Sequence, residues 1–139
     1  MEALKEYVKH YYTTENYNCA EAIIHGANDC YGLNISEDDM KMFGAYGSGI
    51  YAGLVCGALV SGAAVLSKMV VVNKAREEGD TVRPVINGFV RTFNEILQGN
   101  SCRELRPKYF NPKESCLQTV LLASEALEIC VNKLKQESM

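Results

Sequence analysis

The amino-acid sequence predicts an all-α fold: a single-domain bundle of five or six helices over residues 1–139, with a glycine-rich loop before a buried central helix. Apolar residues recur every three or four positions along several segments, which is the periodicity of an amphipathic helix. Helix-capping residues precede these segments, and no window alternates between apolar and polar residues as a half-buried strand does. A chain of 139 residues fits one domain with its own core.

The first helix is expected over residues 2–12, where four apolar or aromatic residues share one face: Leu4, Tyr7, Val8 and Tyr11. The second helix is expected to begin after the Asn18 cap and to end near Gly32, because glycine is the usual residue just beyond a helix C-terminus. A short third helix follows the Ser36 cap and is expected to stop near Gly44.

The middle of the chain is rich in glycine and in apolar residues. Residues 44–49 carry three glycines and are expected to form a loop whose backbone can approach another group closely. The central helix is expected over about residues 53–78, with small residues at every fourth position: Gly53, Gly57 and Ser61. Glycines, serines and a lysine interrupt the apolar stretch 50–72, so we expect a buried helix and no membrane span.

Two further helices and a short helical turn complete the expected bundle. Gly79-Asp80 is expected to break the chain, and Thr81 to cap a helix that carries Pro84 in its first turn and stops at residues 99–100. Cys102 is expected to open a short turn that ends at Pro107. After a loop over residues 108–112, the last helix is expected over about residues 115–135.

One four-residue pattern occurs three times: Asn18-Cys19-Ala20-Glu21, Ser101-Cys102-Arg103-Glu104 and Ser115-Cys116-Leu117-Gln118. Each joins a capping residue to a Glu or Gln three positions later, which is the capping box of a helix start. The cysteine would then occupy the first helical position, where free backbone N–H groups and the positive end of the helix dipole favour an anion. We therefore expect these thiols to have lowered pKa values and to reach the thiolate form that attacks disulfides and binds metals.

Cys56 joins this set because it lies near the start of the glycine-rich helix, where Gly53 and Gly57 have no side chain to cover its sulfur. Cys30, at the end of a helix, and Cys130, on an apolar stripe, are interpreted as small core residues. None of the cysteines has CxxC spacing, so neither a zinc ribbon nor a thioredoxin motif is supported. A shared site must be assembled from four distant segments.

These residues resemble a known family, the redox-active proteins with four cysteines and a CGAxxG motif that are labelled C_GCAxxG_C_C. The resemblance spans about residues 10–127 and rests on residues 17–22, Cys56-Gly57-Ala58, residues 100–105 and Ser115-Cys116. It places the family's four cysteines at Cys19, Cys56, Cys102 and Cys116. It departs at Ser61, where the motif ends in glycine. It implies a helical bacterial or archaeal protein with redox chemistry, often encoded near transporter genes.

Other side chains are weaker candidates for the site. His25 is expected to be solvated or paired with Glu21, four residues before it. Arg103 could bring positive charge to the thiols, but a surface ion pair is the preferred interpretation. Tyr46 and Tyr51 flank the glycine-rich loop and could line a pocket, although core packing is slightly favoured.

The composition of the chain limits the kinds of partner and the cellular compartment that we expect. The net charge is −3 with no basic stripe, so no nucleic-acid partner is expected. The glycine-rich segment lacks GxxxxGK[ST], so no nucleotide site is expected either. The first residues are polar and acidic and show no signal peptide, which predicts a cytoplasmic protein. In that reducing compartment, clustered cysteines are typical of metal-binding or redox-catalytic sites.

Three functions remain open. In the leading one, the four matched cysteines are catalytic, and at least one pair cycles between dithiol and disulfide. In the second, the same thiolates bind an iron–sulfur cluster or a structural zinc, with Gly53 and Gly57 beside the cofactor. In the third, the protein is a non-catalytic redox sensor that works with a transporter or a redox partner and forms a homodimer through its small-residue face.

Overall fold

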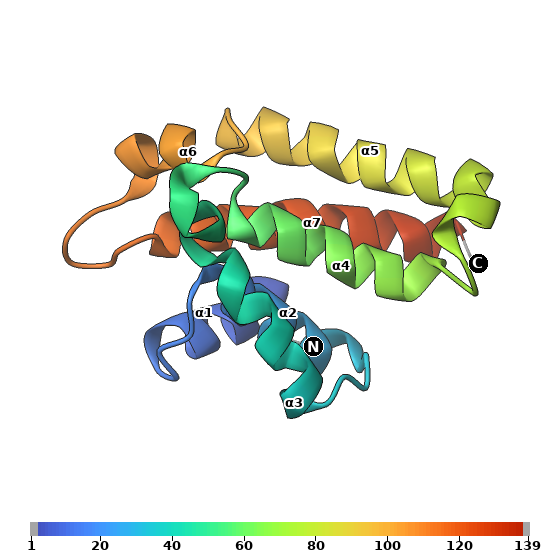
Figure 1. The fold of residues 1–139 in the computed structure, drawn as a ribbon, viewed down its shortest axis with the longest axis horizontal. Helices are drawn as coiled ribbons and strands as arrows, with labels where there is room; N and C mark the ends of the chain where they lie inside the picture. Colours follow the sequence, from blue (N-terminus) through green and yellow to red (C-terminus); the bar gives the residue numbers. More distant parts are fainter. Residues whose placement is uncertain (1–2, 138–139) are drawn as a thin grey trace.

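The computed structural model describes residues 3–137 as one all-α domain, which confirms the expected fold class (Figure 1). These residues contain seven α-helices: α1 (Leu4–Thr13), α2 (Cys19–Tyr31), α3 (Glu37–Met40), α4 (Gly57–Val70), α5 (Gly79–Leu97), α6 (Cys102–Tyr109) and α7 (Leu117–Glu137). Three short helical turns join them: η1 (Lys41–Tyr46), η2 (Gly49–Gly53) and η3 (Ala75–Glu78). The count exceeds the expected five or six helices because α6, expected as a short turn that ends at Pro107, is an α-helix of eight residues with Pro107 inside it.

The central helix of the bundle is α4, which packs against α2, α5 and α7 (Figure 1). Its small residues are buried at these contacts. A Cβ atom on Gly62 would lie 2.4 Å from the Phe89 ring of α5, and one on Gly57 would lie 3.1 Å from the Ala20 Cβ of α2. Ser61 is fully buried, and its hydroxyl donates a hydrogen bond to the Ala20 carbonyl across the helix contact (2.8 Å). Gly57 and Ser61 of the predicted small-residue face are therefore covered within the chain.

The serine that replaces the motif glycine at position 61 thus has a structural role. Its side chain is small enough for the close approach of α4 to α2, and its hydroxyl finds a buried acceptor. A buried hydroxyl without a partner would destabilise this contact, whereas the bonded one adds a specific link between the two helices.

The expected boundaries around α4 and α5 are wrong in detail. α4 ends at Val70, not near residue 78, because the chain turns over residues 71–74. The Glu78 carboxylate holds this turn by accepting hydrogen bonds from the backbone N–H groups of Val72, Asn73 and Lys74 (2.7–2.8 Å). η3 then leads directly into α5, so the pair Gly79-Asp80 begins the helix and does not break the chain.

The segment expected to be a glycine-rich loop forms short helical turns instead. Three residues here have left-handed backbone conformations, which residues other than glycine rarely adopt: Ser48 (φ 52°), Ile50 (φ 61°) and Tyr51 (φ 54°). Gly49 is also left-handed, and a Cβ atom there would lie 2.8 Å from the Cys102 Cβ. The missing side chain therefore allows η2 to lie against the start of α6.

Within residues 3–137, no single helix has both the length and the apolar character needed to cross a bilayer. The segments Gly57–Val70 and Ala75–Leu97 pass that test only together, and they are bent by 76° relative to each other.

Candidate functional site

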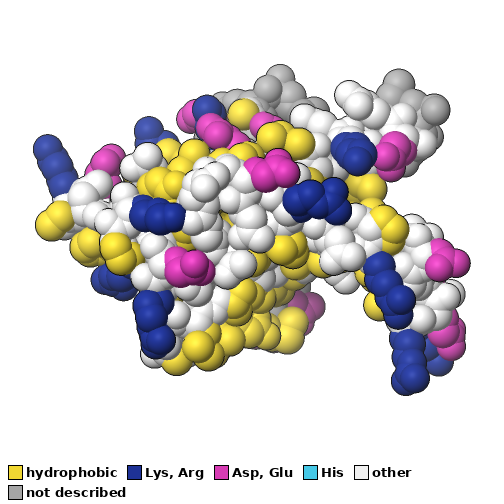
Figure 2. All heavy atoms as spheres, turned by 90° about the horizontal axis from the view of Figure 1, so that it is seen from above, with side chains coloured by type: hydrophobic (Ala, Val, Ile, Leu, Met, Phe, Trp, Pro, Cys, Tyr) yellow, Lys and Arg dark blue, Asp and Glu magenta, His cyan; other side chains and the backbone are white. Residues whose placement is uncertain are grey.

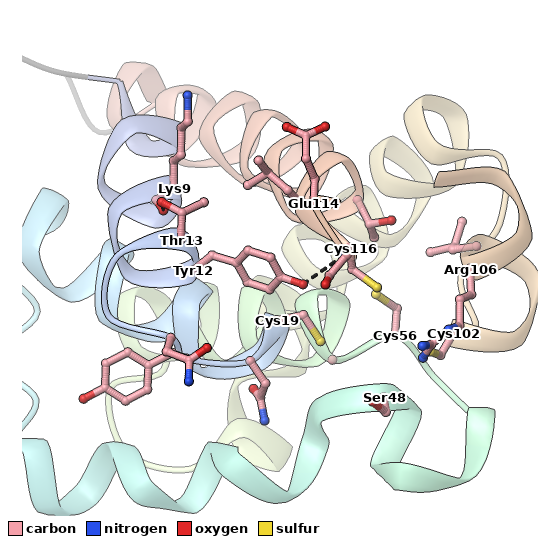
Figure 3. Close-up of a pocket in the computed structure, with 18 of the residues that line it drawn as sticks. Lys9, Tyr12, Thr13, Cys19, Ser48, Cys56, Cys102, Arg106, Glu114 and Cys116 are labelled. Atoms are coloured by element: carbon pink, nitrogen blue, oxygen red, sulfur yellow. Dashed lines mark hydrogen bonds between the residues drawn. The ribbon is translucent and has the colours of Figure 1, made fainter. Parts of the chain in front are cut away.

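A cavity of about 700 Å³ lies between α1 and the beginnings of four other helices (Figure 3). All four cysteines selected from the sequence line it: Cys19, Cys56, Cys102 and Cys116. Cys30 and Cys130 lie outside it and pack, partly buried, against the core. The structure therefore brings together four segments that are distant in the sequence, whereas the catalytic and metal-binding roles assigned to these cysteines stay predictions.

Two of the cysteines occupy first helical positions behind complete capping boxes, as expected. Before α2, the Asn18 side chain accepts a hydrogen bond from the Glu21 N–H (2.9 Å), and the Glu21 carboxylate accepts one from the Asn18 N–H (3.1 Å). Before α6, Ser101 and Glu104 form the same pair of bonds (3.1 and 3.3 Å). These bonds fix the helix starts at Cys19 and Cys102.

The third capping box, expected at Ser115, is wrong. Ser115 is in the left-handed region (φ 56°) and forms a backbone bridge to Asn111, with N···O distances of 2.7 and 3.1 Å, so it does not cap a helix. α7 begins at Leu117, and Cys116 directly precedes it. The Cys116 carbonyl accepts the hydrogen bond of the Val120 N–H (3.0 Å), so this cysteine lies at the helix entrance, not in its first turn.

Cys56 and Cys102 are positioned by a short antiparallel bridge between Val55 and Ser101. The Cys56 N–H donates to the Asn100 carbonyl (2.9 Å), and the Cys102 N–H donates to the Leu54 carbonyl (2.7 Å). Cys56 itself precedes α4 with an extended backbone, and its carbonyl accepts hydrogen bonds from the N–H groups of Leu59 and Val60 (3.0 and 3.1 Å). The bridge therefore holds the beginnings of α4 and α6 next to each other.

Cys19 and Cys116 are held by contacts from neighbouring helices. The Cys19 sulfur packs against α4, where a Cβ atom on Gly57 would lie 3.0 Å from it. The Cys116 N–H donates a hydrogen bond to the hydroxyl of Tyr12 on α1 (2.9 Å; Figure 3). No local pattern in the sequence indicates that Gly57 contacts the Cys19 sulfur. Nor does any local pattern indicate that Tyr12 binds the backbone of Cys116.

The expected lowering of the thiol pKa values at helix starts is wrong for three of the cysteines. Burial raises the pKa of Cys56 from 9.0 to about 12, and it also raises the pKa values of Cys19 and Cys116. The backbone does act in the expected direction, since hydrogen bonding to the backbone of Ser48 and Ala20 lowers the pKa of Cys19. Loss of water around the sulfur outweighs this effect.

The thiols also affect one another through charge. After burial, the thiolate of Cys19 is the largest contribution that raises the pKa values of both Cys56 and Cys116. Ionised Cys102 in turn raises the pKa of Cys19. Ionised Cys102 also raises the pKa values of Cys56 and Cys116, although less than Cys19 does. Repulsion of this kind requires that the sulfurs lie near one another, so Cys19 and Cys102 each lie close to the other three cysteines.

Several cavity residues were not singled out in the sequence. Lys9, Arg106 and Lys113 bring positive charge to the lining, and the charge of Arg106 lowers the pKa of Cys116. The guanidinium of Arg106 also lies over the Phe110 ring, 4.4 Å from its centre. Arg103 points elsewhere and donates to the Ala52 carbonyl (3.3 Å).

Two of the weaker sequence candidates and one glycine lie away from the cavity. Tyr46 and Tyr51 do not line it, and Tyr51 is 69% exposed. Gly53 is also outside the lining, and a Cβ atom there would meet the Arg103 guanidinium at 3.3 Å. Gly57 remains the one of the two predicted glycines that contacts the cysteine cluster.

His25 is not solvated, whereas the charge of Glu21 does act on it: against the larger effect of burial, this charge raises its pKa. It is 6% exposed and stacks on the Tyr17 ring, with ring centres 4.2 Å apart, and the Tyr11 ring lies 5.0 Å away. Burial lowers the pKa of His25. Its neutral ring therefore packs against Tyr17, which lines the cavity.

The cysteines do not form a ready metal site. Within residues 3–137, no group of three or more Cys, His, Asp or Glu side chains has an arrangement that could hold a metal ion. The six cysteines are present as free thiols. A tetrahedral zinc or an iron–sulfur cluster needs its sulfurs around a common centre, about 2.3 Å away for zinc, so the sulfurs would first have to move.

Comparison with known proteins gives one match. A family model described as "Putative redox-active protein (C_GCAxxG_C_C)" matches residues 17–130, a span that contains all four cavity cysteines. No curated protein and no solved structure matches the chain.

Proposed function

Since this chain belongs to the C_GCAxxG_C_C family of redox-active proteins, we propose that its cavity cysteines carry out thiol–disulfide exchange, with Cys19 as the shared partner in the disulfides that form. The observation that carries this proposal is the convergence of Cys19, Cys56, Cys102 and Cys116 on one cavity. Cys19 has the central part because its charge acts on Cys56 and Cys116 more strongly than that of any other thiol.

Each cycle converts two thiols into one disulfide. A thiolate of the cluster attacks an external disulfide, forms a mixed disulfide and expels the first external thiolate. A second cysteine then attacks the protein sulfur of the mixed disulfide and expels the second thiolate. Two electrons pass from the protein to the external disulfide, and the two protons of the cysteines end on the two released thiols.

Burial protects the thiols between cycles. A buried, neutral thiol is protected from uncontrolled oxidation, which depends on thiolate character and exposure. Each cysteine of the cluster therefore reacts only after it has lost its proton, and the positive charge of Arg106 favours that loss at Cys116.

The test uses protein in which Cys30 and Cys130 are replaced by serine, so that only the cavity thiols remain. This parent is equilibrated without oxygen in mixtures of reduced and oxidised dithiothreitol, and its disulfides are mapped by peptide mass spectrometry. We expect one intramolecular disulfide that contains Cys19. If the parent keeps four free thiols in the most oxidising mixture, the proposal is wrong.

Single serine variants of the parent test the role of Cys19. Cys19→Ser should abolish the intramolecular disulfide, whereas Cys56→Ser and Cys116→Ser should each leave Cys19 with another partner. Urea denaturation of the reduced variants identifies any that fail to fold. A disulfide of unchanged yield in folded Cys19→Ser would overturn the central role of this residue.

The same samples distinguish the metal-binding alternative. Anaerobically purified protein that carries stoichiometric iron and sulfide, or zinc that blocks the exchange, would replace thiol–disulfide exchange with a metal-based function.

A further inference from the structure

The cavity that holds the four cysteines has the size of a small-molecule site and a positive lining. Its volume of about 700 Å³ lies within the range of about 300 to 1,000 Å³ that is typical of such sites. Three cations line it, Lys9, Arg106 and Lys113, together with one carboxylate, that of Glu114. None of the three cations forms an ion pair with another described residue.

This positive lining contrasts with the chain as a whole, whose net charge is −3. Figure 2 shows several Lys and Arg side chains at the end of the molecule that carries α6. α2, α4, α6 and α7 all begin at the cavity, and the partial positive charges of their N-termini add to those of the cations. The buried thiols do not cancel this charge, because raised pKa values keep Cys19, Cys56 and Cys116 neutral near pH 7.

The cations flank the cysteine cluster. In the view of Figure 3, Lys9 lies on one side of Cys116 and Arg106 on the other. Arg106 is one helical turn after Cys102, so the two side chains share a face of α6. Lys113 lies in the loop that leads to Cys116. An elongated molecule with a negative group at each end would place its middle beside Cys116.

We infer that the substrate of this cavity is a small disulfide with a carboxylate at each end, an inference that rests on the proposed exchange chemistry. Lys9 binds one carboxylate and Arg106 binds the other, with Lys113 adding positive charge to the lining, so that the disulfide bond lies beside Cys116. Cys116 loses its proton, attacks one substrate sulfur as a thiolate and expels the first carboxylated thiolate. Cys19 then attacks the Cys116 sulfur, forms the Cys19–Cys116 disulfide and expels the second. The protons lost by the two cysteines are taken up by the two products.

Three disulfides of similar size distinguish the effect of substrate charge from the reactivity of the disulfide bond. They are dithiodipropionate with two carboxylates, neutral dithiodiethanol, and cystamine with two ammonium groups. Each disulfide is mixed with the Cys30→Ser/Cys130→Ser parent, and the rate at which the protein is oxidised is measured. This rate is divided by the rate at which the same disulfide reacts with free mercaptoethanol, which removes differences in intrinsic reactivity. We expect a preference of at least about tenfold for dithiodipropionate over cystamine, which falls as salt is added.

Charge variants assign this preference to the cavity. Arg106→Gln and Lys113→Gln should each lower the ratio of the dithiodipropionate rate to the dithiodiethanol rate by about threefold or more, a ratio from which any change in the reactivity of Cys116 itself cancels. Lys74→Gln is the matched control, because Lys74 is exposed and lies outside the cavity. In the parent with Cys19→Ser, the mixed disulfide should accumulate on Cys116 and be visible as an added mass of one mercaptopropionate.

Each outcome bears on one proposal. Equal normalised rates for the three disulfides, or charge variants that behave like Lys74→Gln, would overturn the anionic substrate and leave thiol–disulfide exchange in place. A mixed disulfide trapped on Cys56 or Cys102 would overturn the entry at Cys116. If none of the three probes oxidises the cluster, the proposed function itself is wrong.

Discussion

The Cys19 sulfur lies against the bare backbone of Gly57, in the contact between α2 and α4. A Cβ atom on Gly57 would be 3.0 Å from this sulfur and 2.6 Å from the Tyr46 carbonyl oxygen, which belongs to the backbone and cannot easily move. We expect Gly57→Ala to lower the free energy of unfolding by about 1 to 3 kcal/mol, measured by urea denaturation of the reduced protein.

Gly88→Ala is the control for this substitution, because a Cβ atom on Gly88 in α5 meets nothing within 4 Å. It should stabilise the protein by about 0.5 to 1 kcal/mol through helix propensity alone. Gly57→Ala that is as stable as the wild-type protein would show that the contact adapts.

The hydrogen bond from Ser61 to the Ala20 carbonyl crosses two helices, whereas the buried Ser124 hydroxyl donates to Val120 within its own helix. Ser61→Ala should therefore cost about 1 kcal/mol of stability, and Ser124→Ala should be close to neutral. Urea denaturation of both variants measures the difference. Equal losses would mean that the link between helices adds nothing beyond burial.

The hydrogen bond to the Tyr12 hydroxyl positions the Cys116 backbone at the entrance of α7. Tyr12→Phe leaves this N–H without its acceptor and should cost about 1 to 2 kcal/mol of stability. It should also change the alkylation rate of Cys116 relative to Cys130, followed by mass spectrometry. Tyr51→Phe serves as the control, since Tyr51 is 69% exposed, and it should change neither quantity.

Cys56 predicts how the stability of the reduced protein depends on pH. Burial raises its pKa in the folded chain from 9.0 to about 12, so the folded state holds this proton more tightly than the unfolded state. The resulting stabilisation is complete below about pH 9 and is lost as the pH rises toward about 12. Cys56→Ala should therefore lose less stability than the wild-type protein between about pH 8 and about pH 10. Parallel losses in the two proteins would contradict the assignment.

Glu78 should control the turn between α4 and α5. Its carboxylate accepts from three backbone N–H groups, which lower its pKa, so its stabilising effect is present at neutral pH and is lost as the pH falls through the folded pKa. Glu78→Gln should speed hydrogen exchange at Val72, Asn73 and Lys74. The neighbouring variant Glu77→Gln should leave these amides unchanged.

Local signals in the sequence were sufficient wherever a short segment determines its own structure. The boxes at Asn18 and Ser101 predict helix starts because the cap and the Glu belong to one turn. Ser115 has the same pattern of a capping residue and a Gln three positions later, but its backbone pairs with Asn111 instead. The pattern alone therefore does not determine the conformation. The end of α4 was missed because it depends on Glu78, eight residues beyond Val70, whose role has no sequence pattern.

The candidate site was predictable in its cysteines but not in its surroundings. The helix-start pattern and the family resemblance select the four residues that line the cavity. Burial, which raises the pKa values of Cys19, Cys56 and Cys116, depends on packing between helices and cannot be obtained from a cap motif. Lys9 and Tyr12 were missed for the same reason, since α1 meets the cysteines only in the folded chain.

The bridge between Val55 and Ser101 has a consequence for the order in which the protein matures. During synthesis, Cys56 leaves the ribosome before Asn100 does, so its backbone N–H has no acceptor at that time. The early half of the chain therefore carries Cys19 and Cys56 without the segments that enclose them. We therefore expect these two thiols to be most exposed to oxidation in the nascent chain, before the later half of the chain has folded onto them.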